Sequence, residues 1–358
     1  MKGANGWSDA ASMELIMEEL EARATVRELG RKVFSGTLSS KNALRGEYRN
    51  FVIQGMSNFQ ASRTVPNRSA GLLQYYALLN LAKAELMLTN SSAVVGKRLG
   101  HGLSFNPLAS KTVAGDQLTV VAGGVFGLLY ESRTGHSLPP GTKLPVKALL
   151  MQIPEISTQL RTALKSTTRT GGMFMILAAD DTHCWPLIAI HAGVPLNRPT
   201  LNTLNSVFHQ VDRPDGYKTF FGISPRWGAQ LRFFEGKDKV PRLASGEHDW
   251  FTAAANVWAA RDIFGMTTNE LYDGWLVQSM SSSQSVVMPP SLARYAIAFY
   301  TSSLVRYRPS MFDSQHAPHL AVLFDAITRE TSLPMLQDSF SGLIGREQFF
   351  TSQGALRT

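Results

Sequence analysis

Two long helical segments, one near each end of the chain, most constrain how it can fold: residues 68–88 and 291–309. Each sets polar and cationic side chains inside an otherwise apolar helical pattern, and such groups must be paired or face a ligand because bare burial is costly. Both segments are rich in aromatic residues and too apolar to stand alone, so helix 68–89 is expected to pack against helix 291–308. The residues expected near that contact are Tyr75, Tyr76, Leu79, Tyr295, Phe299 and Tyr300.

The remaining pattern predicts an α+β chain that is predominantly α, with a helical core built from N- and C-terminal blocks and a β-containing middle. Further helices are expected over 10–34, 39–61, 149–165 and most of 247–340. Strands are expected within 116–130, 142–146, 173–177, 187–191 and 218–234, and residues 197–216, with two prolines, as a flexible loop. The expected divisions are an N-terminal helical block (1–110), a middle segment (111–240) and a C-terminal helical block (241–358) that packs on the first.

Composition and the single cysteine suggest in which cellular compartment the protein is located. The formal net charge is +8, and no apolar run approaches the roughly 20 residues needed to cross a bilayer. The N-terminus lacks the apolar core of a signal peptide, and one cysteine cannot form an intramolecular disulfide. We therefore expect a cytoplasmic protein that does not contact a membrane.

Cys184 lies beside His183 and close to Asp180 and Asp181. One interpretation is a nucleophile with a neighbouring base; the favoured one is a small buried residue on a strand, where adjacent side chains point to opposite faces. The eight histidines are scattered without metal-ligand spacing, and there is no phosphate-binding P-loop or dinucleotide motif. We expect no metal and no cofactor.

Positive charge is concentrated between Lys97 and Arg169, which span nine Lys and Arg residues but three acidic ones. Steps of four place Arg161, Lys165 and Arg169 on one face of the expected helix, and clustering of this kind favours a polyanionic partner. The alternative is a solvated helix face.

A second cationic group, Arg306 and Arg308, ends the C-terminal helix before Pro309. Cations in a last helical turn complement the helix dipole and cap free carbonyls. The alternative is a phosphate clamp, for which the planar guanidinium is well suited.

Several motifs in order give the chain a resemblance to the YaaC-like family. They are the Tyr75-Tyr76 helix with Asn80 and Lys83, then His101-Gly-Leu, a glycine-rich strand at Gly123–Phe126, Leu149–Ile156 and the segment from Pro290 to Pro309. The family is bacterial, and the resemblance implies a fold more than a reaction.

The first block also resembles HEPN-type helical domains, on its aromatic Tyr75-Tyr76 helix followed by Arg98 and His101. HEPN proteins are often dimeric, and many are ribonucleases in toxin, defence or stress systems. The resemblance implies catalytic roles for His101 and Arg98, because a metal-free ribonuclease needs a proton-transfer group and a cation near the phosphate. The alternative is that His101 caps a helix or hydrogen-bonds a backbone carbonyl.

Together these features predict a nucleic-acid or nucleotide-phosphate binding component of a bacterial defence or stress system. Its expected phosphate contacts are Lys97, Arg161, Lys165, Arg169, Arg306 and Arg308. The alternatives are a non-catalytic protein-interaction subunit of a multi-protein complex and a metal-independent HEPN-type ribonuclease. The expected partners are RNA or DNA, together with a protein partner or a second copy of the chain.

Overall fold

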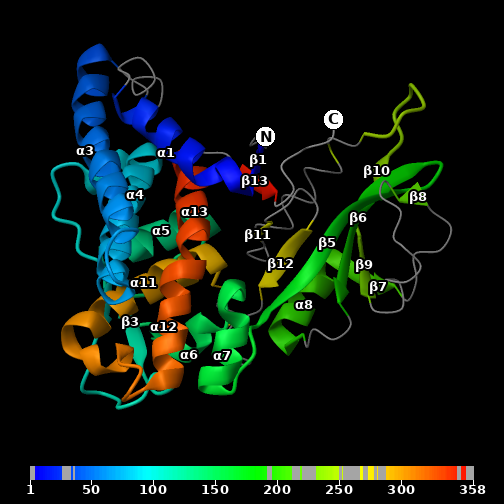
Figure 1. Cartoon of the computed structure of the whole chain (residues 1–358). Coiled ribbons are helices and arrows are strands. Elements are labelled where there is room, and N and C mark those ends of the chain that lie inside the picture. Colours follow the sequence, from blue (N-terminus) through cyan, green and yellow to red (C-terminus); the bar gives the residue numbers. More distant parts are fainter. Residues whose placement is uncertain are drawn as a thin grey trace. The chain divides into compact units, whose positions relative to one another are not determined.

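The computed structural model describes residues 5–25, 34, 37–191, 196–211, 218–219, 231–249, 252, 267–268, 273–277, 280, 288–344 and 348–351. The fold is α+β and predominantly α, as the sequence predicts (Figure 1). The chain forms two compact units: a sheet unit, Thr168–Pro290, and a helical unit that joins Lys2–Thr167 to Ser291–Thr358. The N- and C-terminal blocks therefore share one core.

The helical unit contains the long helices that the sequence predicts. Its helices are α1 (Asp9–Thr25), α3 (Leu38–Ser62), α4 (Asn67–Val94), α5 (Val125–Thr134), α6 (Val146–Leu150), η1 (Pro154–Ile156), α7 (Ser157–Leu164), α11 (Pro290–Tyr307), η2 (Pro309–Phe312), α12 (Pro318–Glu330) and α13 (Ser332–Ile344). Its strands are β1 (Asn5–Ser8), β2 (Leu103–Phe105), β3 (Gln117–Val120), β4 (Lys143–Pro145) and β13 (Gln348–Thr351), with β1 paired to β13.

Helix α4 lies at the centre of this unit, beside α3 and α13 (Figure 1). Gly55 lets α3 approach closely, since a Cβ there would lie 2.8 Å from Leu81 Cγ on α4. The predicted end of the helix near Asn90 matches a kink, where Asn90 leaves helical geometry at φ −150° and ψ 71°. The Asn90 side chain then accepts a hydrogen bond from the Ala93 amide and restarts one more turn.

The predicted packing of α4 on α11 is confirmed. The Tyr75 ring lies 5.9 Å from the Tyr295 ring and 5.4 Å from the Phe299 ring, both edge-on. Gly71 on α4 meets Thr301 on α11, which a Cβ at position 71 would approach to 3.5 Å. Aromatic packing of this geometry adds stability beyond the area that it buries.

The buried charged and amide side chains inside these two helices are paired, as their burial requires. Gln74 donates to the Thr328 carbonyl at 2.7 Å, and Glu85 accepts two hydrogen bonds from Arg133, at 2.9 and 2.6 Å. On α11, the buried Arg294 pairs with both Glu155 and Asp338. These ion pairs join α4, α5, α11, α13 and η1 through the core.

A three-stranded sheet in the order β2-β3-β4 follows α4. The strand predicted at Gly123–Phe126 is wrong, because α5 begins at Val125 with Gly124 as its N-cap. Gly123 has a φ of +64°, which strand geometry does not allow. The glycines here make a turn into a helix, so β3 ends at Val120.

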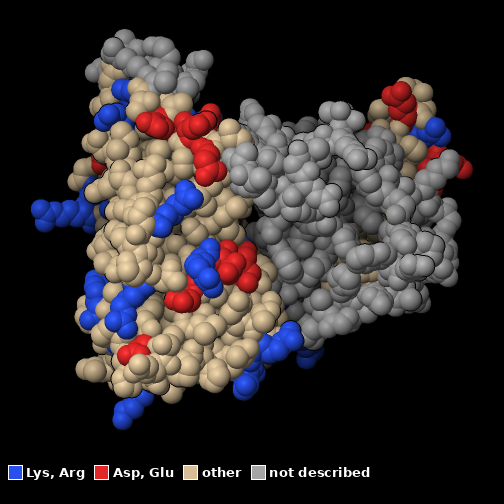
Figure 2. Space-filling view, in the orientation of Figure 1, with Lys and Arg blue, Asp and Glu red and all other residues tan. Residues whose placement is uncertain are grey.

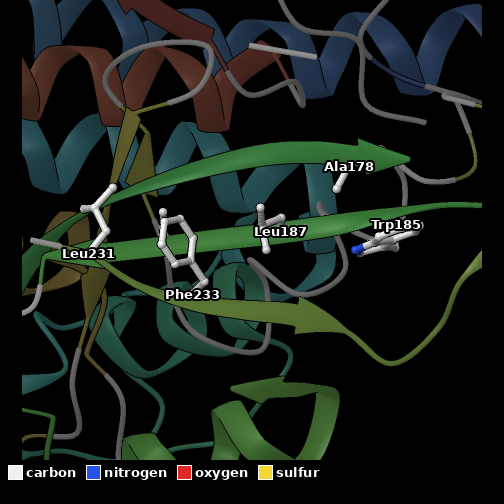
Figure 3. Close-up of a cluster of buried hydrophobic side chains, with 6 residues drawn as sticks. Ala178, Trp185, Leu187, Leu231 and Phe233 are labelled. Carbon is white, nitrogen blue, oxygen red and sulfur yellow. The ribbon is translucent and has the colours of Figure 1, made fainter. Parts of the chain in front are cut away.

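The sheet unit is antiparallel. Its main path is β11-β12-β5-β6-β9-β7, with β10 on β6 and β8 on β5. The bounds are β5 (Thr170–Ala179), β6 (His183–His191), α8 (Arg198–Val207), β7 (Phe208–Val211), β8 (Lys218–Thr219), β9 (Leu231–Gly236), β10 (Val240–Pro241), β11 (Thr267–Thr268) and β12 (Asp273–Val277). Figure 3 shows its buried cluster, in which Trp185, Leu187 and Phe233 come from β6 and β9. Cys184 on β6 is buried, as predicted.

Two predictions for this unit are wrong. Residues 197–216 are not a loop where the structure describes them: Asn197 caps α8 by accepting from the Thr200 amide at 3.0 Å, and β7 follows. The helical prediction for 247–340 fails at β12, which pairs with β5 from Thr170 to Phe174. The rest of 253–287 lies largely outside the described residues.

Candidate functional site

Helix α4 presents a polar strip beside its buried face. Tyr76, Asn80 and Lys83 follow each other at steps of four and three, which align side chains on one side of a helix. The Tyr76 side chain is 37% exposed, whereas Tyr75 is buried. Asn80 donates to the Tyr76 carbonyl at 2.8 Å, and the Lys83 ammonium lies 5.5 Å from the centre of the Phe51 ring. Tyr76 and Lys83 therefore border the helix face that Tyr75 buries.

His101 lies in the segment between α4 and β2, held against the start of α5. Its carbonyl accepts from the Phe126 amide at 3.1 Å, and the Gly100 carbonyl accepts from the Val125 amide at 3.0 Å. Gly102 and Gly124 allow this contact, since a Cβ on Gly124 would lie 2.1 Å from Gly102 Cα. The two glycines thus fix the backbone that carries the histidine.

The His101 ring is half-buried among aromatic side chains. Its Nδ1 shares a hydrogen bond of 2.5 Å with the Tyr75 hydroxyl. The ring centroid lies 5.4 Å from that of Tyr75 and 5.8 Å from that of Phe299 on α11. Because Nδ1 is engaged by Tyr75, Nε2 is the nitrogen that His101 offers to a ligand.

Helix α11 carries a cation, Arg306, in its last turn. Arg306 lies two turns after Phe299 on that side of the helix, and its Nε donates to the Ser302 carbonyl at 3.2 Å. Its guanidinium is exposed and lies 5.4 Å from the centre of the Tyr307 ring, which is 58% exposed. Arg306 therefore caps a helix carbonyl and still faces solvent.

Burial and nearby charges shift the pKa values of His101, Lys83 and Tyr75. Burial lowers the pKa of His101, and the charges of Arg306 and Lys83 lower that pKa further. Burial also lowers the pKa of Lys83, an effect that Glu47 opposes. Burial raises the pKa of Tyr75 far above its usual range, so its hydroxyl stays neutral. The lowered pKa keeps the His101 imidazole uncharged at neutral pH.

We call the group formed by Tyr76, Lys83, His101, Arg306 and Tyr307 the His101 surface. It combines a nitrogen able to move a proton, two cations able to hold an anion, and two exposed aromatic rings. In Figure 2 acidic side chains gather around α1, while Lys and Arg are spread over the visible face of the helical unit among further acidic side chains.

Comparison with family models gives a match over most of the chain. The model for YaaC-like protein matches residues 35–319. The chain belongs to the YaaC-like family. Searches of curated proteins and of solved structures found no match. Every residue of the His101 surface lies within the region matched by the family model.

The predicted partner of His101 is not one of the cations that act on it. Arg98 and Lys97 are exposed, and neither side chain makes a hydrogen bond or ion pair with a described residue. The charges that reach His101 come from Lys83 and Arg306. Lys83, whose charge lowers the pKa of His101, was not among the predicted site residues; its alignment with Tyr76 and Asn80 on one helical strip was the available signal.

Arg308 of this YaaC-like chain has a structural position. Its guanidinium pairs with both oxygens of Asp116, at 2.8 and 3.1 Å, and donates to the carbonyls of Pro107 and Ser110. The Asp116 side chain is 0% exposed and also accepts from the Tyr300 hydroxyl at 2.6 Å. All three guanidinium nitrogens are engaged, so Arg308 ties a loop to the core.

The three cations predicted on one helix face do not share it. Helix α7 ends at Leu164, and Lys165 adopts left-handed geometry at φ +49°, so the one-face prediction is wrong. Arg161 and Lys165 are exposed in the helical unit. Arg169 belongs to the sheet unit, where it donates to the Met280 carbonyl. Pro154 had already interrupted the longer helix expected over 149–165.

Other kinds of site find no counterpart in the part of the chain that the structure describes. There, no group of three or more His, Cys, Asp or Glu side chains is arranged to hold a metal ion, and no helix is both long and apolar enough to cross a membrane. A small cavity between α4, α5, α11 and α13, lined by Arg133, Tyr295 and Asp338, measures about 10 Å³. That is room for a single water molecule.

Proposed function

We propose that this YaaC-like protein binds the phosphates of a nucleic acid or nucleotide at the His101 surface. What supports the proposal is that a half-buried histidine, held by Tyr75 and packed beside Phe299, has its pKa lowered by burial and by the charges of Arg306 and Lys83, which lie on two different helices. Both charges would attract a phosphate that binds beside His101. A phosphate here gains two cations and the Nε2 of His101.

The surroundings of the site support an anionic ligand. Lys97 and Arg98 are exposed and precede His101 by four and three residues, so they extend the positive charge around it. Arg306 offers a planar guanidinium that faces solvent, which suits a phosphate. The HEPN-like first block further supports a place for the protein in a bacterial defence or stress system.

Salt-dependent binding tests the proposal. A labelled RNA should bind the full-length protein at low salt and lose affinity steeply towards physiological salt, because bound phosphates release counterions. Lys83→Gln should weaken binding across all sequences, whereas Lys147→Gln, which changes a partly exposed lysine on α6, should not. Absence of binding at low salt would contradict the proposal.

A protein-interaction subunit is the second candidate, and the Arg308 loop favours it. Leu108 is 91% exposed at the tip of a loop whose Pro107 and Ser110 carbonyls are held by Arg308. A preformed loop with an apolar tip binds a protein partner at little entropic cost. If the protein fails to bind nucleic acid at low salt, this candidate gains.

A metal-independent ribonuclease is a third candidate that shares the first one's site. The Nε2 of His101 would move the proton, and Arg306 or Lys83 would steady the phosphate. Cleavage of RNA by the wild type and its loss in a folded His101→Ala protein would support turnover. Full cleavage by folded His101→Ala would remove His101 from the mechanism.

A further inference from the structure

We infer that Tyr75 is a positioning residue for His101: its hydroxyl donates to the imidazole Nδ1, so that neutral His101 carries its proton on Nε2 and meets a ligand as a hydrogen-bond donor. The inference rests on the proposed function, because it says how His101 would contact a phosphate. It concerns which ring nitrogen holds the proton, and this is set by the hydrogen bond that the other nitrogen makes.

The contact between the two side chains is held from both sides. The Tyr75 oxygen and His101 Nδ1 lie 2.5 Å apart. Tyr75 is 1% exposed, and its ring meets the rings of Tyr295 and Phe299 edge-on. The His101 ring packs against Phe299 with a centroid distance of 5.8 Å, and its carbonyl accepts from the Phe126 amide. Neither side chain can turn away without losing these contacts, so the bond is built into the fold.

The direction of the bond follows from the acidity and basicity of the two groups. A phenol hydroxyl, with an ordinary pKa of about 10, is a stronger donor than the N–H of a neutral imidazole. The bare imidazole nitrogen is in turn a stronger acceptor than a phenol oxygen, since imidazolium has an ordinary pKa of about 6.5. The neighbouring Tyr295 hydroxyl makes no hydrogen bond with a described residue and would be the weaker acceptor. The single hydroxyl proton of Tyr75 therefore goes to Nδ1.

The proton of His101 then has one place left. A neutral imidazole carries one proton, so a ring that accepts at Nδ1 holds that proton at Nε2. Nε2 makes no hydrogen bond with a described residue, and it is not among the buried polar atoms that lack a partner there. It therefore reaches solvent, and its N–H is free to donate to a ligand.

This tautomer suits binding better than it suits the first step of RNA cleavage. Phosphate oxygens are acceptors, so an Nε2–H donor contacts them without the imidazole first taking up a proton. The same N–H cannot accept a proton, so neutral His101 would serve as a general acid and not as the base that activates a nucleophile. A ribonuclease built on this site would need a second group as its base.

Nitrogen NMR on the full-length protein, with nitrogen-15 in its histidines, reads the tautomer directly. The signals of His101 are those that disappear in His101→Asn. At a pH well above the ordinary histidine pKa of about 6.5, we expect Nδ1 to resonate as an unprotonated nitrogen and Nε2 as a protonated one. The reverse pattern, or an average of the two tautomers, would overturn the inference.

Two phenylalanine variants separate the Tyr75 hydroxyl from the ring that carries it. Tyr75→Phe keeps the aromatic packing and removes the donor, so His101 should become a mixture of tautomers and bind a labelled oligo(U) about fivefold more weakly at low salt. Tyr295→Phe is the matched control, because it removes a buried hydroxyl of the same cluster that makes no hydrogen bond with a described residue. Its nitrogen shifts and its affinity should equal those of the wild type.

Unchanged nitrogen shifts in Tyr75→Phe, or equal changes in both variants, would contradict the positioning role. Melting curves establish that each variant folds. If Tyr75→Phe does not fold, the wild-type spectrum still decides which nitrogen carries the proton.

Titration of oligo(U) into the labelled protein distinguishes this inference from the proposed function. Bound RNA should shift the Nε2 resonance of His101 more than the Nδ1 resonance. RNA that binds without moving the Nε2 signal would overturn the contact with His101 and leave RNA binding in place. No binding at low salt, with the expected tautomer in the free protein, would remove the proposed function and support Tyr75 as the group that sets the histidine proton.

Discussion

Arg306 and Arg308 stand two residues apart at the end of α11, yet they belong to two regions with opposite physical character. Arg308 is fixed by a carboxylate that is 0% exposed and by two carbonyls. Arg306 makes one helix-capping bond and otherwise faces solvent beside His101. A guanidinium whose donors are all engaged holds the fold, whereas one with free donors can hold a ligand. The same residue type in the same motif therefore serves different purposes.

Removal of Arg308 should give the largest effect. Arg308→Ala would leave Asp116 buried with the Tyr300 hydroxyl but no cation, and we expect a loss of about 3–5 kcal/mol in the free energy of unfolding. Urea denaturation measures this loss. Arg306→Ala, the matched control two residues earlier, should cost less than about 1 kcal/mol because it removes an exposed group. Equal losses in the free energy of unfolding for the two variants would contradict the difference between the two regions.

Substitutions of His101 test the boundary between the two regions, because the His101 ring is packed against other side chains and also accessible to a ligand. His101→Ala would leave the buried Tyr75 hydroxyl without its partner, and we expect a loss of about 1–3 kcal/mol. His101→Asn keeps a polar group near the position of Nδ1 and should recover part of that stability. Thermal melts of both variants decide this, and an unchanged melting temperature for His101→Ala would show that the bond contributes nothing.

A second buried arginine network allows a test of how a buried carboxyl group affects the pH dependence of stability. Asp338 lies with Glu85 and Glu155 among two arginines, Arg133 and Arg294, so acids outnumber cations. Burial raises the pKa of Asp338 despite its pairing with Arg294.

The sign of the pH effect follows from that raised pKa. The folded state binds the Asp338 proton more tightly than the unfolded state, so this contribution to stability is complete below the unfolded pKa and lost as pH rises through the folded pKa. Asp338→Asn keeps an oxygen for Arg294 and should make stability flatter across that acidic range. Denaturation at a series of pH values tests this, and an unaltered pH profile would contradict the role given to Asp338.

Much of the fold follows from local pattern, and most of the site does not. The α4–α11 contact was predictable because long aromatic helices have few ways to bury their rings. The strand predicted at Gly123–Phe126 was wrong because glycines between β-favouring residues are equally compatible with an interrupted strand and with a helix N-cap. Asn197 concealed α8 in the same way, since an N-cap and a loop use the same residue type.

The site depends on positions that are distant in sequence. His101 can be picked out from its sequence motif. The cations that lower its pKa, Lys83 on α4 and Arg306 on α11, cannot. Arg98, the nearest arginine in sequence, is exposed and not among the charges that act on the ring. The buried Asp116 engages Arg308 and not Arg306. The sequence gives no reason to pair Asp116 with Arg308 across the core.

The pH dependence of RNA binding is expected to be a smaller effect, and it tests whether His101 contacts the ligand. The His101 ring packs against Tyr75 and Phe299, and burial together with the charges of Arg306 and Lys83 keeps its pKa low. A bound phosphate opposes those charges, so proton uptake should strengthen RNA binding as pH falls from about 8 to 5.5, by at most about tenfold for each pH unit. His101→Asn should remove most of this dependence; an identical profile would exclude His101 from the contact.

The most direct test of the central contrast is the salt dependence of RNA binding in Arg306→Gln. Arg329, an exposed arginine in the last turn of α12, provides a matched control because it has the same type and helical position as Arg306. We expect Arg306→Gln to reduce the slope of log affinity against log salt by about 0.7, the value for one phosphate contact on a single strand, and Arg329→Gln to leave it unchanged. An unchanged slope in Arg306→Gln, or equal reductions in both variants, would contradict the assignment of Arg306 to the ligand.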